Sequence, residues 1–192
     1  MPEPSGVPRV ADDREAGTLP GWPAGDQRRI LSEPFPARGQ GGDSASYRGQ
    51  VKSSEAETLI NARGSTVWMV LTDAGNLTVW DSGITDIVGD IRNGSTIRVR
   101  IQGSDGRSVR LRVQQVPGQV MLWASGPPLG LLTRVRTFVL TPHGALTRLQ
   151  VKEEVSGPLL RFAQEARPAS EQSLGAFAEA VRIRAELLER HF

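Results

Sequence analysis

The sequence predicts an α+β fold in which a curved antiparallel sheet of seven strands is covered by one long C-terminal helix. Between residues 84 and 154, apolar and polar residues alternate in successive short runs, as side chains on the two faces of a strand do. The last twenty or so residues instead repeat apolar side chains every three or four positions, which is typical of an amphipathic helix. A sheet with one dry face beneath a helix forms a cup that can hold an apolar molecule.

The strands are expected between recognisable turn signals. A first strand is expected at residues 55–62, and others at 84–91, 97–101, 109–113, 120–124, 133–137 and 147–151. The runs Asn93-Gly94, Ser104-Asp105-Gly106, Pro117-Gly118 and Pro142-His143-Gly144 supply turns between them. Alternation predicts that the following strand residues face the dry side of the sheet: Ile97, Val99, Ile101, Val109, Leu111, Val113, Val135, Val139, Leu149 and Val151.

Two short helices are expected after the first strand. Ser65 is a candidate N-cap for a helix over residues 66–72, and a second helical turn is expected around Val79 and Trp80. Pro168 should kink or divide the final helix because it lacks a backbone donor. Leu159, Leu160 and Phe162 would form a separate apolar turn before it. The apolar stripe of the long helix comprises Leu174, Phe177, Ala178, Val181, Ala185 and Leu188.

Residues 1–52 differ in composition from residues 53–192, which are expected to form the folded domain. The first segment is rich in proline and glycine and shows no sustained periodicity, so we expect a largely disordered extension. The apolar segments at residues 19–22 and 30–35 either dock on the domain or a partner, or are incidental in a flexible chain.

Composition excludes several kinds of site. The chain of 192 residues contains no cysteine, so disulfides and thiolate chemistry are absent. Its two histidines are His143, in a turn, and His191, so a histidine metal site or a Ser-His-Asp triad is not expected. We therefore predict no metal and no cofactor. The N-terminus shows no signal sequence and no apolar run is long enough to span a membrane, which predicts a cytoplasmic protein.

Several short motifs resemble one known superfamily. The run Thr66–Asp73 (TVWMVLTD) resembles its first helix, and Trp80 stands where a tryptophan commonly precedes the second strand. Ile87–Ser95 (IVGDIRNGS) is similar to its first hairpin, while Leu122–Gly126, Phe138–Pro142 and Glu153–Leu160 resemble the later strands and the entry to the helix. Residues 54–192 thus resemble the SRPBCC (START / Bet v 1-like) superfamily, in its bacterial polyketide cyclase/dehydrase-like branch.

The resemblance implies a helix-grip fold with a hydrophobic cavity between the sheet and the C-terminal helix. Across the superfamily such cavities serve lipids, polyketides, hormones or partner proteins, so the fold does not specify a reaction. We expect the ligand to contact residues near the open end of the cup. The candidates are Trp80, Val99, Leu111, Trp123, Val135, Thr137, Leu149, Phe177 and Val181.

Two carboxylates are weak candidates for catalysis. Glu153 continues the inward alternation of Leu149 and Val151, and Glu154 matches an acidic residue that is frequent in the superfamily. A carboxylate in an apolar cup would have a raised pKa and could transfer protons. The alternative is that both lie at a wet strand end and bind water or arginine.

Arginines supply the polar half of the alternation. Only Lys52 and Lys152 are lysines among the 23 basic residues. On the outer sheet face we expect the following arginines: Arg98, Arg100, Arg110, Arg112, Arg134, Arg136 and Arg148. An acidic protein could bind there, or the face could simply be solvated; nucleic acid is disfavoured because no exposed aromatic residues are interleaved.

Three functions follow, in order of preference. The first is binding of a hydrophobic small molecule, such as a lipid or polyketide-like compound, in the cup. The second is a polyketide cyclase or dehydratase that uses Glu153 or Glu154. The third is a protein-interaction module that uses the arginines of the outer face. The lack of cysteine and the scarcity of histidine favour a binding protein over an enzyme.

Overall fold

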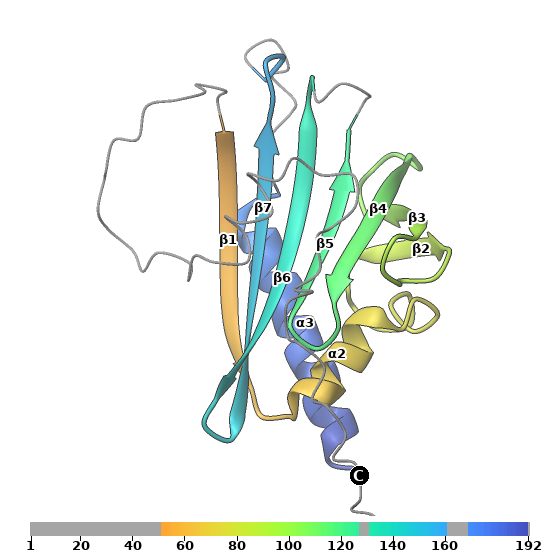
Figure 1. The fold of residues 1–192 in the computed structure, drawn as a ribbon. Coiled ribbons are helices and arrows are strands. Elements are labelled where there is room, and N and C mark those ends of the chain that lie inside the picture. The colour runs from red at the N-terminus through yellow and green to blue at the C-terminus, as the bar shows by residue number, and fades with distance from the viewer. Residues whose placement is uncertain (1–50, 127–130, 161–168, 192) are drawn as a thin grey trace, which may run out of the picture. The chain divides into compact units, whose positions relative to one another are not determined.

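The computed structural model describes residues 51–126, 131–160 and 169–191 (Figure 1). Residues 1–50, Phe162 and Pro168 lie outside them. The expectations for the apolar segments, for the helix kink and for most of the extension therefore concern residues that are not described. The last two residues assigned to the extension, Val51 and Lys52, belong to the first strand. The elements are β1 (Val51–Ile60), α2 (Gly64–Thr72), β2 (Ile84–Val88), β3 (Thr96–Ile101), β4 (Ser108–Val116), β5 (Val120–Ser125), β6 (Thr133–His143), β7 (Leu146–Ser156) and α3 (Glu171–Glu189). The predicted α+β class with a seven-stranded sheet and a long C-terminal helix is confirmed.

The sheet is antiparallel throughout and its strand order is β1-β7-β6-β5-β4-β3-β2. The first strand therefore pairs with the last, and Val51 at its start lies opposite Ser156. The sheet curls around α3, whose principal contacts are with β1, β7 and α2. In Figure 1, β2, β3 and β4 lie to one side of α3. The concave face of the sheet is thus covered by the helix mainly at its β1–β7 side.

The helix α2 begins earlier than expected. Its N-cap position is Arg63, which makes no side-chain cap hydrogen bond, and Ser65 lies inside the helix, so the predicted cap was wrong. Glu189 of α3 holds this end instead, accepting hydrogen bonds from Arg63 Nε (2.6 Å) and Thr66 Oγ1 (2.5 Å). A tertiary contact thereby replaces the local cap that the sequence pattern indicated.

The second short helix is a series of turns. The Asn76 and Leu77 amides donate to Asp73 O, and Val79 N donates to Asn76 O, without a continuous ladder. Asp73 Oδ1 also accepts from Asn76 N at 3.2 Å, a side-chain bond that competes with helix formation. The segment nevertheless brings Leu77 into the core and Trp80 against it.

The core lies between the concave face and α3. The predicted helical stripe is confirmed, because Leu174, Phe177, Ala178, Val181 and Ala185 are buried and Leu188 packs against them. Four aromatic rings form a chain across this core. Trp123 lies 5.1 Å from Phe138, Phe138 lies 5.8 Å from Phe177, and Phe177 lies 6.2 Å from Trp80, between ring centroids.

The faces of β6 are reversed relative to the prediction. Phe138 and Leu140 belong to the core, and they lie opposite Val151 and Leu149 in an uninterrupted register with β7. Arg134 and Arg136, two and four residues before Phe138, therefore share the concave face, whereas Val135 and Val139 lie on the convex face. The isolated run Thr133–Thr137 suggested the opposite because its only apolar residue was assumed to point inward.

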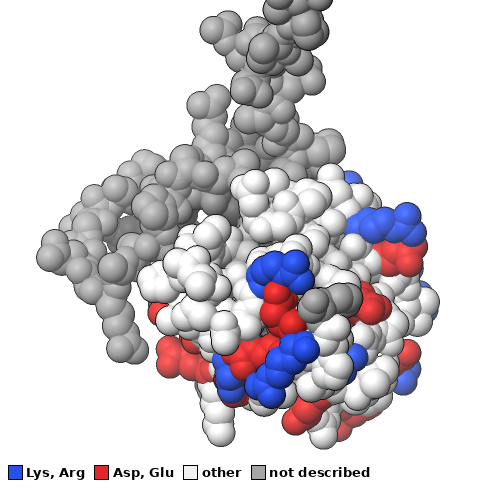
Figure 2. Space-filling view, turned by 90° about the horizontal axis from the view of Figure 1, so that it is seen from below, with Lys and Arg blue, Asp and Glu red and all other residues white. Residues whose placement is uncertain are grey.

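Charged residues also fasten the C-terminal end of α3. Glu186 accepts a hydrogen bond from Asn61 N (3.0 Å) and pairs with Arg182 (2.9 Å), next to the Arg63–Glu189 pair. Figure 2 views this end of the molecule and shows acidic and basic side chains side by side. No helix within the described ranges is long and apolar enough to cross a membrane.

Candidate functional site

Glu153 of β7 is a buried carboxylate with three protein donors. Its residue is 1 % exposed, on the concave face as predicted. Oε1 accepts from Arg134 Nη1 (2.6 Å) and from the backbone N–H of Ala169 (2.8 Å). Oε2 accepts from Arg136 Nε (2.8 Å) and forms an ion pair with Nη2 of the same guanidinium (2.6 Å). The carboxylate thus joins β7, β6 and the residue that leads into α3.

These donors determine the protonation state of Glu153. Burial raises the pKa of its carboxyl, but the charge of Arg136, the hydrogen bonds from Ala169 and Arg136 and the charge of Arg134 together lower it below the ordinary value. The expectation of a raised pKa was therefore wrong. Glu153 is an ionised, fully engaged carboxylate at neutral pH and is not poised to donate a proton.

Trp123 of β5 lies beside this cluster. Its side chain is on the concave face, directly opposite Arg136 on β6 and Val113 on β4, and the residue is 3 % exposed. Its indole Nε1–H is buried and has no hydrogen-bond partner among the described residues. Buried donors are nearly always paired in proteins, so this N–H requires an explanation.

An apolar lip adjoins Trp123 at the part of the concave face that β3 and β4 form. We define the apolar lip as Ile101, Val109 and Leu111, which share the alternation of the core residues Val99 and Val113. Ile101 is 41 % and Val109 is 40 % exposed, although both occupy concave-face positions, and Leu111 is half-buried. The lip therefore offers accessible apolar surface on the face that carries the unpaired Trp123 N–H.

The predicted ligand-binding residues divide into three groups. Trp123 and Leu111 belong to the site just described. Trp80, Val99, Leu149, Phe177 and Val181 are on the same side of the sheet but pack in or against the core. Val135 and Thr137 lie on the convex face, opposite Glu154 and Lys152 of β7. Glu154 shares that face, where it pairs with Lys152 at 2.9 Å.

The arginines also divide between the two faces. Arg134 and Arg136 serve Glu153, so they were wrongly placed on the outer face. Arg98 and Arg110 do lie there, directly opposite each other on β3 and β4. Arg100 is 3.7 Å from Asp86 of β2, whereas the β2 residue opposite Arg98 is Val88. Arg112 of β4 shares this face, and so does Arg148 of β7, opposite Thr141 of β6. The outer arginines are therefore those of β3 and β4 together with Arg148.

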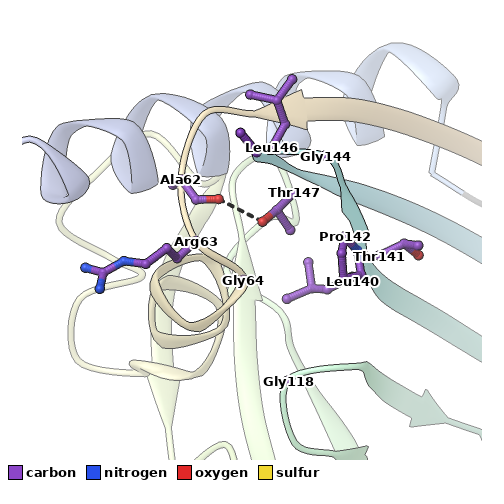
Figure 3. Close-up of a pocket in the computed structure, with 11 residues that line it drawn as sticks. Ala62, Arg63, Gly64, Gly118, Leu140, Thr141, Pro142, Gly144, Leu146 and Thr147 are labelled. Carbon is purple, nitrogen blue, oxygen red and sulfur yellow. Dashed lines mark hydrogen bonds between the residues drawn. The ribbon is translucent and has the colours of Figure 1, made fainter.

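A separate hollow lies at the other end of the sheet (Figure 3). It measures about 240 Å³ and is lined by the β1–α2 link and the start of α2, by the β6–β7 hairpin, and by Gly118 of the β4–β5 turn. Thr147 Oγ1 donates to Ala62 O at 2.7 Å within it, which ties these two segments together. It contains none of the predicted site residues. In the described ranges, no group of three or more acidic, histidine or cysteine residues could hold a metal ion.

Sequence reasoning missed the partners of Glu153. Arg136 was assigned to the wrong face, and Ala169 carried no signal because only its backbone N–H is used. The alternation Arg134, Arg136, Phe138, Leu140 could have revealed the arginines, since the two larger apolar residues of β6 mark its dry face.

Comparison with known proteins agrees with this architecture. The model of the family described as "Polyketide cyclase / dehydrase and lipid transport" matches residues 52–186. Among solved structures, norcoclaurine synthase of Thalictrum flavum, as a point mutant with a transition-state analogue, superposes with a TM-score of 0.57 at 16 % identity over 77 % of this chain and 100 % of that one. A Mesorhizobium loti protein gives 0.54 at 20 % identity over 73 % and 99 %.

The di-domain ARO/CYC StfQ from the steffimycin biosynthetic pathway gives a TM-score of 0.53 at 14 % identity, over 73 % of this chain and 52 % of that one. These identities show a shared fold and no more. No curated protein matches the sequence significantly. The predicted superfamily and helix-grip fold are confirmed.

Proposed function

We propose that this chain, which belongs to the polyketide cyclase/dehydrase and lipid transport family, binds a small hydrophobic molecule on the concave face of its sheet. The family description supports hydrophobic ligand binding or cyclase activity in general terms. The ligand would lie on the apolar lip and extend toward Trp123. Its class, a lipid or a polyketide-like compound, follows the expectation drawn from the sequence.

The exposed apolar lip is the observation that carries this proposal. Strand positions on a concave face are normally covered by the packed helix, yet Ile101 and Val109 are 41 % and 40 % exposed. Covering this apolar surface with a ligand favours binding by about 25 cal/mol for each Å² removed from water. Ligand sites are typically concave and apolar with a few polar groups, and Trp123 and Arg136 supply such groups here.

The cyclase alternative has less support. Both oxygens of Glu153 accept hydrogen bonds from Arg134, Arg136 and Ala169, and its lowered pKa keeps it ionised. Glu154 lies on the convex face beside Lys152. Glu153 therefore faces the concave side but is not in a state to donate a proton, and Glu154 does not face the concave side.

A fluorescent apolar probe tests the proposal on the full chain. N-phenyl-1-naphthylamine is titrated into the wild type, Val109→Asp and Val88→Asp, with circular dichroism to verify folding. Val109 and Val88 are both exposed valines, but Val88 pairs with Arg98 on the convex face. We expect a blue-shifted, saturable emission for the wild type, a loss of affinity of at least about tenfold for Val109→Asp, and no change for Val88→Asp.

Two results would contradict the proposal. One is the absence of saturable binding by the wild type. The other is equal affinity of all three folded proteins, which would show that the probe binds elsewhere. Native mass spectrometry of freshly purified protein extends the test, because a co-purified apolar molecule should dissociate more readily from Val109→Asp than from Val88→Asp.

A further inference from the structure

We propose that the bound molecule carries an uncharged carbonyl oxygen that accepts a hydrogen bond from the indole N–H of Trp123. This inference rests on the ligand-binding function proposed above and adds a chemical class to it. The ligand would be an apolar ketone or ester and not a plain hydrocarbon. The observation that carries it is the buried Nε1–H, which has no partner among the described residues.

The two residues directly opposite Trp123 on the concave face cannot satisfy this N–H, and Gln115, two residues from Val113 on the same face, has a buried Oε1 that makes no hydrogen bond to it or to any other described residue. Its cross-strand neighbours are Val113, which is apolar, and Arg136, whose guanidinium only donates. The ring of Phe138 packs at 5.1 Å with its plane inclined by 66°. A buried donor without an acceptor costs free energy. A ligand that brings an acceptor to this N–H should therefore bind more tightly than a ligand of the same shape that has none.

The carboxylate that pairs with Arg136 is also committed elsewhere. Oε1 of Glu153 is taken by Arg134 and Ala169, and Oε2 is taken by two nitrogens of Arg136. Glu153 therefore does not serve Trp123. An anionic ligand would have to compete with Glu153 for Arg136, whereas a neutral carbonyl adds an acceptor without disturbing that pair. These contacts select an uncharged acceptor.

The position of the apolar lip indicates where the hydrocarbon part of the ligand lies. Leu111 lies two residues from Val113 on the same face of β4, and Val113 is directly opposite Trp123. Val109 and Ile101 continue this apolar surface toward the turn between β3 and β4. A molecule whose oxygen reaches Trp123 would thus lay its hydrocarbon body along the lip.

A pair of matched ligands tests the inference. 2-Acetylnaphthalene and 2-isopropenylnaphthalene have nearly the same shape, but the first has a carbonyl oxygen where the second has a methylene group. The wild-type chain should bind the ketone about tenfold more tightly, the ratio expected when one ligand leaves a buried donor unpaired. Trp123→Phe, which removes the N–H and keeps an aromatic ring, should reduce this ratio to near one.

Trp68→Phe is the matched control. It makes the same substitution in α2, away from the lip, and should preserve the tenfold preference. Equal affinities of the wild type for the two ligands would overturn the inference. Failure of both ligands to bind would instead contradict the proposed function, so the two failures are distinguishable.

A spectroscopic readout on the wild type covers the case in which Trp123→Phe does not fold. The chain has four tryptophans, so a ¹H–¹⁵N spectrum of the indole groups is sparse. We expect the ketone to shift the Trp123 indole proton downfield and the hydrocarbon to leave it nearly unshifted. No selective shift on saturation with the ketone would refute the proposed hydrogen bond.

Discussion

Glu153 on β7 and Arg136 on β6 face each other on the concave side of the sheet, with 2.6 Å between Oε2 and Nη2. The same carboxylate accepts the backbone N–H of Ala169 at 2.8 Å, immediately before the Ser170 N-cap of α3. One buried anion therefore links two strands to the start of the helix that covers them. This role accounts for a charged residue at a buried position of the concave face.

Replacing Glu153 with Gln should destabilise the protein. The substitution removes a charge from a buried pair and leaves Arg136, which has 17 % side-chain exposure, with a weaker partner. We expect the free energy of unfolding to fall by about 3 kcal/mol, measured by urea denaturation. Glu154→Gln is the control, because that side chain is 34 % exposed on the other face, and it should cost less than about 1 kcal/mol. Equal losses for both variants would contradict the central role of Glu153.

The lowered pKa of Glu153 predicts a direction for acid sensitivity. Its arginine and backbone partners favour the ionised form in the folded state, so the unfolded state binds a proton more readily. The stabilisation is fully present above the ordinary pKa of about 4.5 and is lost as pH falls through the lower folded value. Urea midpoints between about pH 6 and 3 should decline more steeply for the wild type than for Glu153→Gln.

Glu179 and Glu189 also have lowered pKa values, caused mainly by hydrogen bonds from Arg182 and Thr66 respectively. They contribute acid sensitivity of the same sign, so Glu153→Gln should retain part of the decline. Parallel pH profiles for the wild type and Glu153→Gln would refute the assignment of this effect to Glu153.

Two glycines should respond to alanine in opposite directions. Gly157 has φ of +129°, and a Cβ there would lie 2.5 Å from the carbonyl oxygen of Leu131. Gly157→Ala should therefore lower the free energy of unfolding by about 3 kcal/mol. Gly175 lies within α3 and a Cβ would meet no atom within 4 Å, so Gly175→Ala should stabilise by about 0.5–1 kcal/mol. Thermal unfolding of both variants checks the pair, and a neutral Gly157→Ala would contradict the described packing of this loop.

The like-charged pair on the convex face predicts a stabilising substitution. Arg98 and Arg110 lie directly opposite each other on β3 and β4. Arg98→Glu converts this repulsion into an attraction and should raise stability by about 0.5 kcal/mol at low salt. The gain should shrink at about 1 M salt, where exposed charges are screened. Arg98→Gln is the control and should give about half the gain in stability. A gain that does not change with salt would contradict the electrostatic explanation and indicate a change in packing.

The alternation and the helical stripe were sufficient to predict most of the fold. Leu174, Phe177, Ala178, Val181 and Ala185 are buried as their spacing indicated, because a helix places residues three and four apart on one face. Glu153 was likewise assigned to the concave face from its alternation with Leu149 and Val151. These successes share one cause, which is that periodicity along a single element is a local property.

The errors concern relations between elements. The faces of β6 were reversed because the run Thr133–Thr137 is ambiguous until Phe138 is placed opposite Val151 of β7. The N-cap of α2 was misplaced because Glu189, more than a hundred residues away in sequence, binds Arg63 and Thr66. A raised pKa was expected for Glu153 in an apolar cup, with binding to water or arginine as the alternative. Which arginines reach Glu153 depends on the register of β6 against β7, which the pattern of one strand does not give.

By itself, the sequence determined the α+β class, the curved sheet, the covering helix and the family resemblance, because patterning and turn residues act within a few positions of each other. Only the tertiary structure decided which arginines turn inward, that Glu153 is ionised and that the Trp123 N–H is buried without a partner. The physical reason is that strand register and helix packing bring together groups distant in the chain, and these contacts set burial, charge and hydrogen bonding at the candidate site.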